Sequence, residues 1–155
     1  MKYFTSLFLF FFCLLAVKAQ ADLDFTGETI TFNADDGLKV TADLYMPHAS
    51  SAPFIILYHQ AGYSRGEYRS IAPKLNELGF NCMAVDQRSG DKVNGVMNKT
   101  HQEAKNKNLP IEYLDALPDI EAAYLYVKYG IKPEKIILWG SSYSAAIMFY
   151  MGSVH

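Results

Sequence analysis

KIILWGSSYSAAIMFYM, residues 135–151, is the segment that decides the fold. Its first part, Ile136 to Trp139, is an uninterrupted apolar run that ends at Gly140, which is typical of a parallel strand buried on both faces. Its last part, Ala145 to Met151, is apolar all round and predicts a helix packed inside a fold. Few residues separate the two parts, so the chain must reverse its direction close to Ser142.

A tight turn of this kind strains its central residue and brings together the residues two positions before and after it. Those two residues should be small, and here they are Gly140 and Ser144. The strain would lift the hydroxyl of Ser142 off the sheet, in front of the N–H groups that open the helix. Such a hydroxyl suits a nucleophile; the alternative is a serine-rich turn of an ordinary α/β domain without one.

The pattern Gly-x-Ser-x-Ser over residues 140–144 resembles the nucleophile elbow of the α/β-hydrolases, whose usual form is Gly-x-Ser-x-Gly. Ser144 replaces the second glycine, which is a change of one small residue for another. The resemblance implies that Ser142 is the catalytic nucleophile and that the N–H of Tyr143 is one donor of the oxyanion hole. Gly140 and Ser144 would then support the elbow.

A second motif follows the apolar run Phe54 to Tyr58, which predicts another buried strand. His59-Gln60-Ala61-Gly62 stands where the α/β-hydrolases have a loop that begins with His-Gly. The resemblance implies that the N–H of Ala61 is the other donor of the oxyanion hole, with Gln60 and Gly62 supporting the loop. For His59 we favour a bracing role over that of a base.

The rest of the pattern is similar to the N-terminal portion of the α/β-hydrolase sheet. We therefore predict an α/β fold in which an antiparallel edge hairpin precedes three parallel strands with helices on both faces, the C-terminal strands being missing. In the second hairpin strand, apolar and polar residues alternate, which predicts one apolar and one solvated face. The expected strands are 28–32, 38–45, 54–58, 80–85 and 136–139, and the expected helices are 68–78, 117–129 and 145–151. Residues 92–108 are expected to form a long loop, with a helical turn inside it as an alternative.

Three further features have a plain structural interpretation and a functional one. Asp86-Gln87-Arg88-Ser89 stands where the family commonly has Asp-x-Arg-Gly, and we interpret Asp86 as a salt-bridged loop carboxylate instead of the catalytic acid. His101 is expected to be solvated. Asn98-Lys99-Thr100 is a glycosylation sequon, which matters only if the secretory route is eukaryotic.

Residues 1–19 have the pattern of a signal peptide, with Lys2 before an apolar stretch and a small-x-small site that ends at Ala19. Cleavage there predicts a secreted or periplasmic protein without a stable membrane anchor. The mature chain would carry 12 basic and 16 acidic residues, a formal charge of −4, and no basic cluster, which argues against nucleic acid as a partner. No spacing of His, Cys or carboxylates suggests a metal, and we expect no cofactor.

In the α/β-hydrolases the triad follows the chain order Ser, then Asp or Glu, then His. The resemblance therefore implies an acid and a base after the elbow, yet the sequence ends at His155, about 20 Å along the helix from Ser142. We accordingly expect this chain to be an N-terminal fragment of a longer enzyme. Residues 20–155 would form a truncated α/β-hydrolase domain that is inactive in this form.

Our first hypothesis is an exported serine hydrolase that acts on small-molecule carboxylic esters. It resembles serine esterases and dienelactone-hydrolase-like enzymes, although dienelactone hydrolases proper have cysteine where this chain has Ser142. One alternative is a non-catalytic binding or interaction protein that retains a hydrolase half-fold. Another is an acyltransferase on the same scaffold, which would pass the acyl group to an alcohol. The sequence leaves the particular ester and the oligomeric state open.

Overall fold

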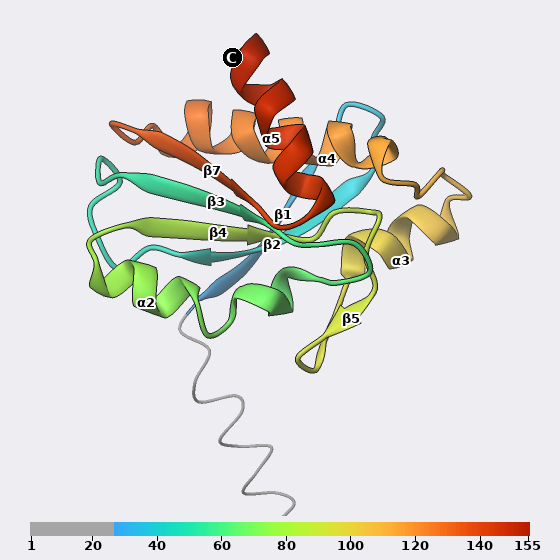
Figure 1. Cartoon of the computed structure of the whole chain (residues 1–155), viewed down its shortest axis with the longest axis horizontal. Coiled ribbons are helices and arrows are strands. Elements are labelled where there is room, and N and C mark those ends of the chain that lie inside the picture. The colour runs from blue at the N-terminus through green and yellow to red at the C-terminus, as the bar shows by residue number, and fades with distance from the viewer. Residues whose placement is uncertain (1–26) are drawn as a thin grey trace, which may run out of the picture.

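The structure is a computed structural model that describes residues 27–155, in which helices cover both faces of a five-stranded sheet (Figure 1). The predicted signal peptide, residues 1–19, lies outside the described residues. The sheet has the order β1-β2-β4-β3-β7, with β1 and β2 antiparallel and β4, β3 and β7 parallel to one another. Its strands are β1 (Glu28–Asn33), β2 (Lys39–Tyr45), β4 (Asn81–Val85), β3 (Phe54–Tyr58) and β7 (Ile136–Gly140). The predicted edge hairpin and parallel strands are confirmed.

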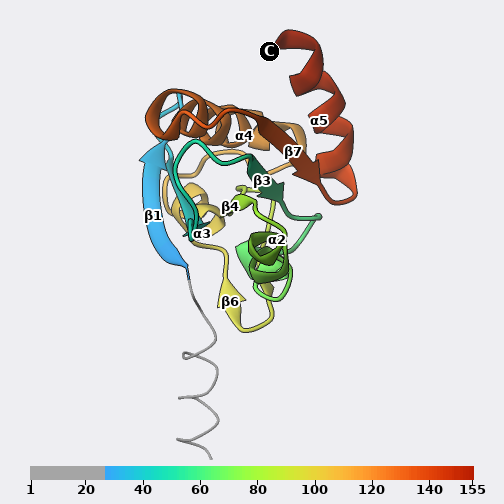
Figure 2. The same ribbon diagram turned by 90° about the vertical axis from the view of Figure 1, so that its left-hand side faces the viewer.

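The sheet separates two hydrophobic clusters, and helices cover each of them (Figure 2). On one face α4 and α5 pack over the sheet, and on the other α2 covers a smaller cluster that includes Cys82. Every side chain of β3 is buried, as expected of a strand paired on both sides. The helical elements are η1 (Arg65–Tyr68), α2 (Ala72–Glu77), α3 (Lys99–Asn106), η2 (Leu114–Ala116), α4 (Leu117–Leu125), the π-helix η3 (Tyr126–Ile131) and α5 (Tyr143–Val154).

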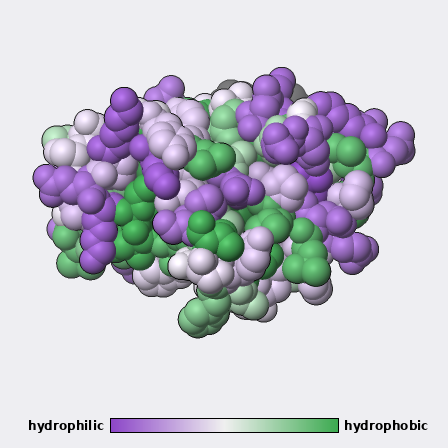
Figure 3. Space-filling view, turned by 90° about the horizontal axis from the view of Figure 1, so that it is seen from above, coloured by the Kyte–Doolittle hydropathy of each residue, from purple (hydrophilic) through white to green (hydrophobic). Residues whose placement is uncertain are grey.

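The elbow strand β7 is less covered than the sequence pattern predicts. It pairs with β3 on one side, and within residues 27–155 no strand pairs with its other side. Trp139 on β7 is 43% exposed and Phe149 on α5 is 83% exposed. Seen from above, the molecule shows apolar patches among polar side chains (Figure 3). None of the helices formed by residues 27–155 has the length and apolar character needed to cross a membrane.

The prediction of a solvated face on β2 is wrong, because Thr41, Asp43 and Tyr45 are all buried. Elements distant in the sequence cover this face. Arg65 forms an ion pair with Asp43 over 2.9 Å, and the hydroxyl of Thr100 accepts a hydrogen bond from the N–H of Thr41. Asp43 and the backbone of Thr41 have buried partners from elsewhere in the chain, which the alternation by itself could not reveal.

The expected long loop over residues 92–108 is also wrong. It contains the small hairpin of β5 (Lys92–Val93) and β6 (Val96–Met97), followed by the helix α3. The side chain of Asn98 caps α3 by accepting a hydrogen bond from the N–H of His101 over 2.8 Å. Because Asn98 is fully buried and its amide nitrogen donates to the carbonyl oxygen of Gln87, the sequon is inaccessible in the folded protein.

Two helix predictions need smaller corrections. The helix expected over residues 68–78 is split into η1 and the shorter α2. The helix expected over residues 117–129 continues as a π-helix to Ile131, and the N–H of Lys132 donates to the carbonyl oxygen of Val127. Lys132, with φ 61°, takes the left-handed conformation that glycine most often supplies after a helix. His101 is half-buried instead of fully solvated, and its Nδ1 donates to the carbonyl oxygen of Arg88 over 2.7 Å.

Candidate active site

Ser142 occupies the junction of β7 and α5 in a conformation that non-glycine residues rarely adopt. Its φ is 55° and its ψ is −121°, and the helix begins at the next residue, Tyr143. Such a conformation costs about 1–3 kcal/mol and persists only where its surroundings enforce it. The side chain of Ser142 is exposed, and no hydrogen bond among residues 27–155 engages its hydroxyl. The predicted strand, tight turn and helix are therefore present, with a free hydroxyl at their centre.

The two small residues that flank the turn have different reasons to be small. A Cβ atom on Gly140 would lie 2.5 Å from the carbonyl carbon of Ser144 and 2.6 Å from the nitrogen of Ala145, both of them backbone atoms. Ser144 itself is fully buried, and its hydroxyl donates to the carbonyl oxygen of His59 over 2.6 Å. The serine therefore ties the elbow to the end of β3, a contact that glycine could not make.

His59 is fully buried, and both of its ring nitrogens are engaged. Nδ1 donates to the carbonyl oxygen of Gln60 over 2.7 Å, and Nε2 accepts from the N–H of Gln87 over 2.9 Å. The side-chain amide of Asn98 also contacts Nε2, at 3.2 Å. Desolvation lowers the pKa of His59 to about 4, so the ring is neutral at pH 7. With both nitrogens occupied by its own loop and the loop after β4, His59 has none free for a proton from Ser142.

Acidification should destabilise the fold through His59. Its pKa falls from 6.5 to about 4 on folding, so between these values the unfolded chain binds more protons and stability decreases as the pH decreases. Over the whole range between these two pKa values, the free energy of unfolding should decrease by about 3 kcal/mol. Urea unfolding at a series of pH values should show this contribution in the chain and in a His48→Gln control, and not in His59→Gln. Equal pH dependence in all three proteins would contradict a buried neutral His59.

The backbone amides of the loop after β3 are engaged on either side of Ala61. The N–H of Gln60 donates to Oε2 of Glu67 over 2.9 Å, and that of Gly62 to the carbonyl oxygen of Ser89 over 3.3 Å. No hydrogen bond among residues 27–155 uses the N–H of Ala61. The N–H of Tyr143 opens α5 and has no acceptor within the helix. The two amides assigned to the oxyanion hole are thus available to a ligand.

Asp86 is held in a buried ion pair. Its carboxylate accepts from the guanidinium of Arg65 over 2.6 Å and from the backbone N–H groups of Arg65 and Lys99, each over 2.8 Å. Desolvation raises the pKa of Asp86, and the positive charge of Arg65 opposes that rise. All of these contacts join structural elements, so Asp86 fits the loop carboxylate that the sequence suggested.

A second buried ion pair was not anticipated from the sequence. Arg88 contacts Asp119 of α4 through both Nε and Nη2, the latter over 2.7 Å, and contacts Asp36 of the first hairpin over 2.6 Å. Asp119 is fully buried. Gln87 was also missed: it donates to the hydroxyls of both Tyr143 and Ser144, each over 2.8 Å. Only its position inside the Asp-x-Arg motif could have drawn attention to it.

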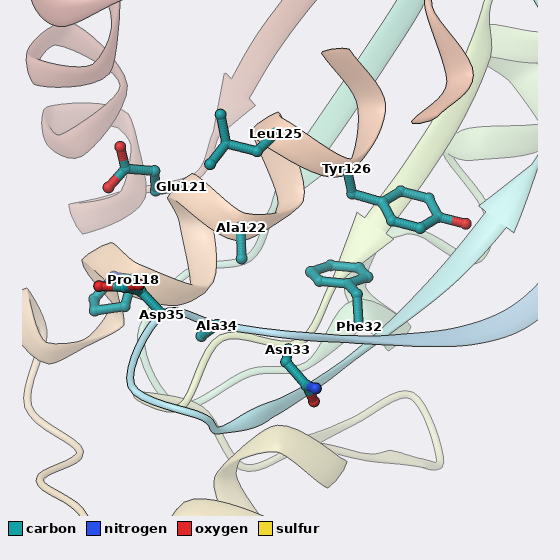
Figure 4. Close-up of a pocket in the computed structure, with 9 residues that line it drawn as sticks. All are labelled: Phe32, Asn33, Ala34, Asp35, Pro118, Glu121, Ala122, Leu125 and Tyr126. Carbon is teal, nitrogen blue, oxygen red and sulfur yellow. The ribbon is translucent and has the colours of Figure 1, made fainter. Parts of the chain in front are cut away.

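Two further features of the structure, a cleft and the C-terminal histidine, lie apart from Ser142. A cleft of about 670 Å³ separates the first hairpin from α4, where Phe32 stacks on Tyr126 at 5.1 Å between ring centroids (Figure 4). It includes none of the predicted site residues. His155 contacts Glu121 at 3.4 Å and stacks near Tyr124, so it is not a partner of Ser142. Within residues 27–155, no cluster of three or more His, Cys, Asp or Glu side chains could hold a metal ion.

Comparisons with known proteins identify the fold. An esterase from Pyrococcus furiosus is 21% identical with a TM-score of 0.57, covering 81% of this chain and 46% of its own. A carboxyl esterase from Bacillus coagulans is 17% identical with a TM-score of 0.54, covering 73% of this chain and 35% of its own. Epoxide hydrolase A from Mycobacterium thermoresistibile is 17% identical with a TM-score of 0.55, and the match covers 81% of this chain and 34% of the hydrolase.

The chain therefore has an α/β-hydrolase fold in part, and it spans less than half the length of these three structures. No family model and no curated protein matches the sequence. At these identities the likeness concerns the scaffold, and the chemistry has to be argued from the residues at the elbow.

Proposed function

We propose that this chain carries the nucleophile and the oxyanion hole of an exported serine hydrolase that acts on carboxylic esters. The observation that supports it most is Ser142, which is strained at φ 55° and holds a free hydroxyl at the start of α5. Strain that the surroundings must enforce is typical of functional positions. The scaffold likeness to esterases is consistent with this assignment.

In the proposed reaction, the oxygen of Ser142 attacks the acyl carbon while its proton passes to a histidine base. The N–H groups of Ala61 and Tyr143 donate to the oxyanion that forms, and each such donor contributes about 3 kcal/mol of transition-state stabilisation. The intermediate collapses to an acyl-enzyme as the alcohol leaves with the proton. Water then attacks the acyl carbon with the help of the same base, which releases the acid and restores Ser142.

The proposal requires a base from outside the described residues. Within residues 27–155, no histidine is hydrogen-bonded to Ser142, and an isolated serine hydroxyl is a weak nucleophile. Export rests on the signal peptide proposed for residues 1–19, and a mature protein that begins at Gln20 in the periplasm or the medium would support it.

The test is covalent labelling of the natural gene product with a fluorophosphonate, read out by intact mass and peptide mapping. We expect one adduct on Ser142, a loss of at least about a hundredfold in labelling and ester hydrolysis in Ser142→Ala, and no change in Ser153→Ala. Ser153 is a suitable control because it lies on the same helix and bonds only to Tyr150 one turn earlier. Ester hydrolysis that survives in Ser142→Ala would refute the proposal, and absent labelling would favour a non-catalytic binding protein.

A further inference from the structure

Two serines of this chain stand where the α/β-hydrolase pattern has glycine, and both of their hydroxyls belong to one buried network. The hydroxyl of Ser89 bonds to that of Tyr143, and the hydroxyl of Ser144 accepts from Nε2 of Gln87. The same Nε2 of Gln87 also donates to the hydroxyl of Tyr143. Gln87 and Ser144 are fully buried, and Ser89 is almost so. The two departures from the family pattern are therefore joined through Gln87 and Tyr143: Gln87 donates to Ser144 and to Tyr143, and the hydroxyl of Tyr143 bonds to Ser89.

The network reaches both halves of the proposed oxyanion hole. Towards the loop after β3, the backbone N–H of Gln87 donates to Nε2 of His59, and the hydroxyl of Ser144 donates to the carbonyl oxygen of His59. Towards the elbow, Gln87 holds the side chain of Tyr143, whose ring also stacks on Tyr113 with centroids 5.0 Å apart. Gln87 thus contacts Tyr143 directly through its side chain. Through its backbone N–H it also contacts His59, which lies two residues before Ala61 in the chain.

We propose that Gln87 is a positioning residue that fixes the separation between the N–H groups of Ala61 and Tyr143. Ser144 is its direct partner, and Ser89 is joined to it through the hydroxyl of Tyr143. The inference rests on the function proposed above. An oxyanion is stabilised only by donors that lie within about 2.7–3.1 Å of it, so the relative position of two donors from different segments matters for the reaction. Glycine at position 144 would remove one partner of the Gln87 side chain, and glycine at position 89 would remove one partner of the Tyr143 hydroxyl.

Burial of the Gln87 side chain leaves one of its polar atoms without a hydrogen bond to any of residues 27–155, which lowers the stability of the fold. Its Oε1 is buried and has no hydrogen-bond partner among the described residues, whereas Nε2 makes both of its bonds. An unsatisfied buried acceptor opposes folding. An apolar side chain could fill the same space without this cost. The two hydrogen bonds that Nε2 donates therefore explain why a glutamine occupies this position.

The first experiment measures hydrogen exchange by mass spectrometry in the chain and in Gln87→Met, Ser144→Ala and Ser153→Ala. Loss of one buried hydrogen bond should speed exchange about tenfold. We expect Gln87→Met and Ser144→Ala to speed exchange in both segments 59–62 and 141–144, and Ser153→Ala to affect neither. A change confined to 141–144 in Ser144→Ala, or an equal change throughout the sheet, would overturn the proposed link.

The second readout is the rate of fluorophosphonate labelling, separated into initial binding and the covalent step. If Gln87 positions the donors, Gln87→Met should slow the covalent step about tenfold and leave initial binding unchanged. Weaker binding with an unchanged covalent step would contradict a positioning role. If the unmodified protein takes no label, the proposed function fails, and the exchange pattern still decides whether Gln87 couples the two segments.

Discussion

Replacing Gly140 by alanine is expected to lower the free energy of unfolding by about 3 kcal/mol. The added Cβ would lie 2.5–2.7 Å from the carbonyl group of Ser144 and the nitrogen of Ala145. These are backbone atoms at the start of α5, so no side-chain rotation relieves the contact and the helix must shift. Overpacking of this kind typically costs about 1–3 kcal/mol, and a clash with the backbone falls at the upper end.

Urea unfolding followed by circular dichroism measures this change, and Gly152→Ala is the matched control. Gly152 lies on the same helix, and a Cβ atom there would meet nothing within 4 Å. Because alanine favours a helix over glycine, the control should be unchanged or more stable by up to about 1 kcal/mol. If Gly140→Ala were as stable as the unaltered chain, the turn at Ser142 could not be as tight as described.

Replacing Arg88 by methionine is expected to lower the free energy of unfolding by about 3–5 kcal/mol. The variant leaves the carboxylate of Asp119 fully buried without its guanidinium partner, which is the costly way to break a buried ion pair. Asp36 also loses its partner, although its exposed carboxylate is better solvated. A double variant, Arg88→Met with Asp119→Leu, should recover part of the loss, because no buried charge then remains unpaired.

The pH dependence of Arg88→Met distinguishes this cause from lost packing. Desolvation already raises the pKa of Asp119, and removing the guanidinium of Arg88 removes the side-chain hydrogen bonds and the positive charge that oppose that rise. Because the folded state then binds a proton that the unfolded chain releases, the variant should lose stability as the pH rises from about 5 to 8. Thermal unfolding at both pH values measures the difference.

Lys107→Met is the control for a lost positive charge. Lys107 pairs with Glu103 on the surface of α3 over 3.3 Å, and such an exposed pair contributes less than about 1 kcal/mol. A cost for Arg88→Met no greater than that of Lys107→Met would mean that the buried pair with Asp119 contributes little to stability.

The structure of residues 135–151 was well predicted from the sequence, because the features that determine it lie close together in the chain. A short apolar run, a glycine and an apolar helix leave the chain little choice of conformation, and the strand, turn and helix are where the sequence indicated. The edge hairpin was predictable for the same reason, since its turn residues lie between two strands that pair with each other.

The helix α3 was not predictable in this way. Residues 99–106 are polar, and only Thr100 and Ala104, one turn apart, are buried. The helix is stabilised by its cap at Asn98 and by packing against β2, nearly 60 residues earlier in the chain. A polar stretch has no hydrophobic period to detect when so few of its side chains face the core.

The sequence by itself determined the layered α/β architecture and the elbow at Ser142, because both follow from local apolar patterning and from the steric need for small residues beside a tight turn. Only the tertiary structure decided the partners of buried polar groups: Gln87 with Ser144, and Arg88 with Asp119. These pairs join segments 31 to 57 residues apart. A buried charge or amide is stable only with its partner, and which partner it meets depends on how the sheet brings distant loops together.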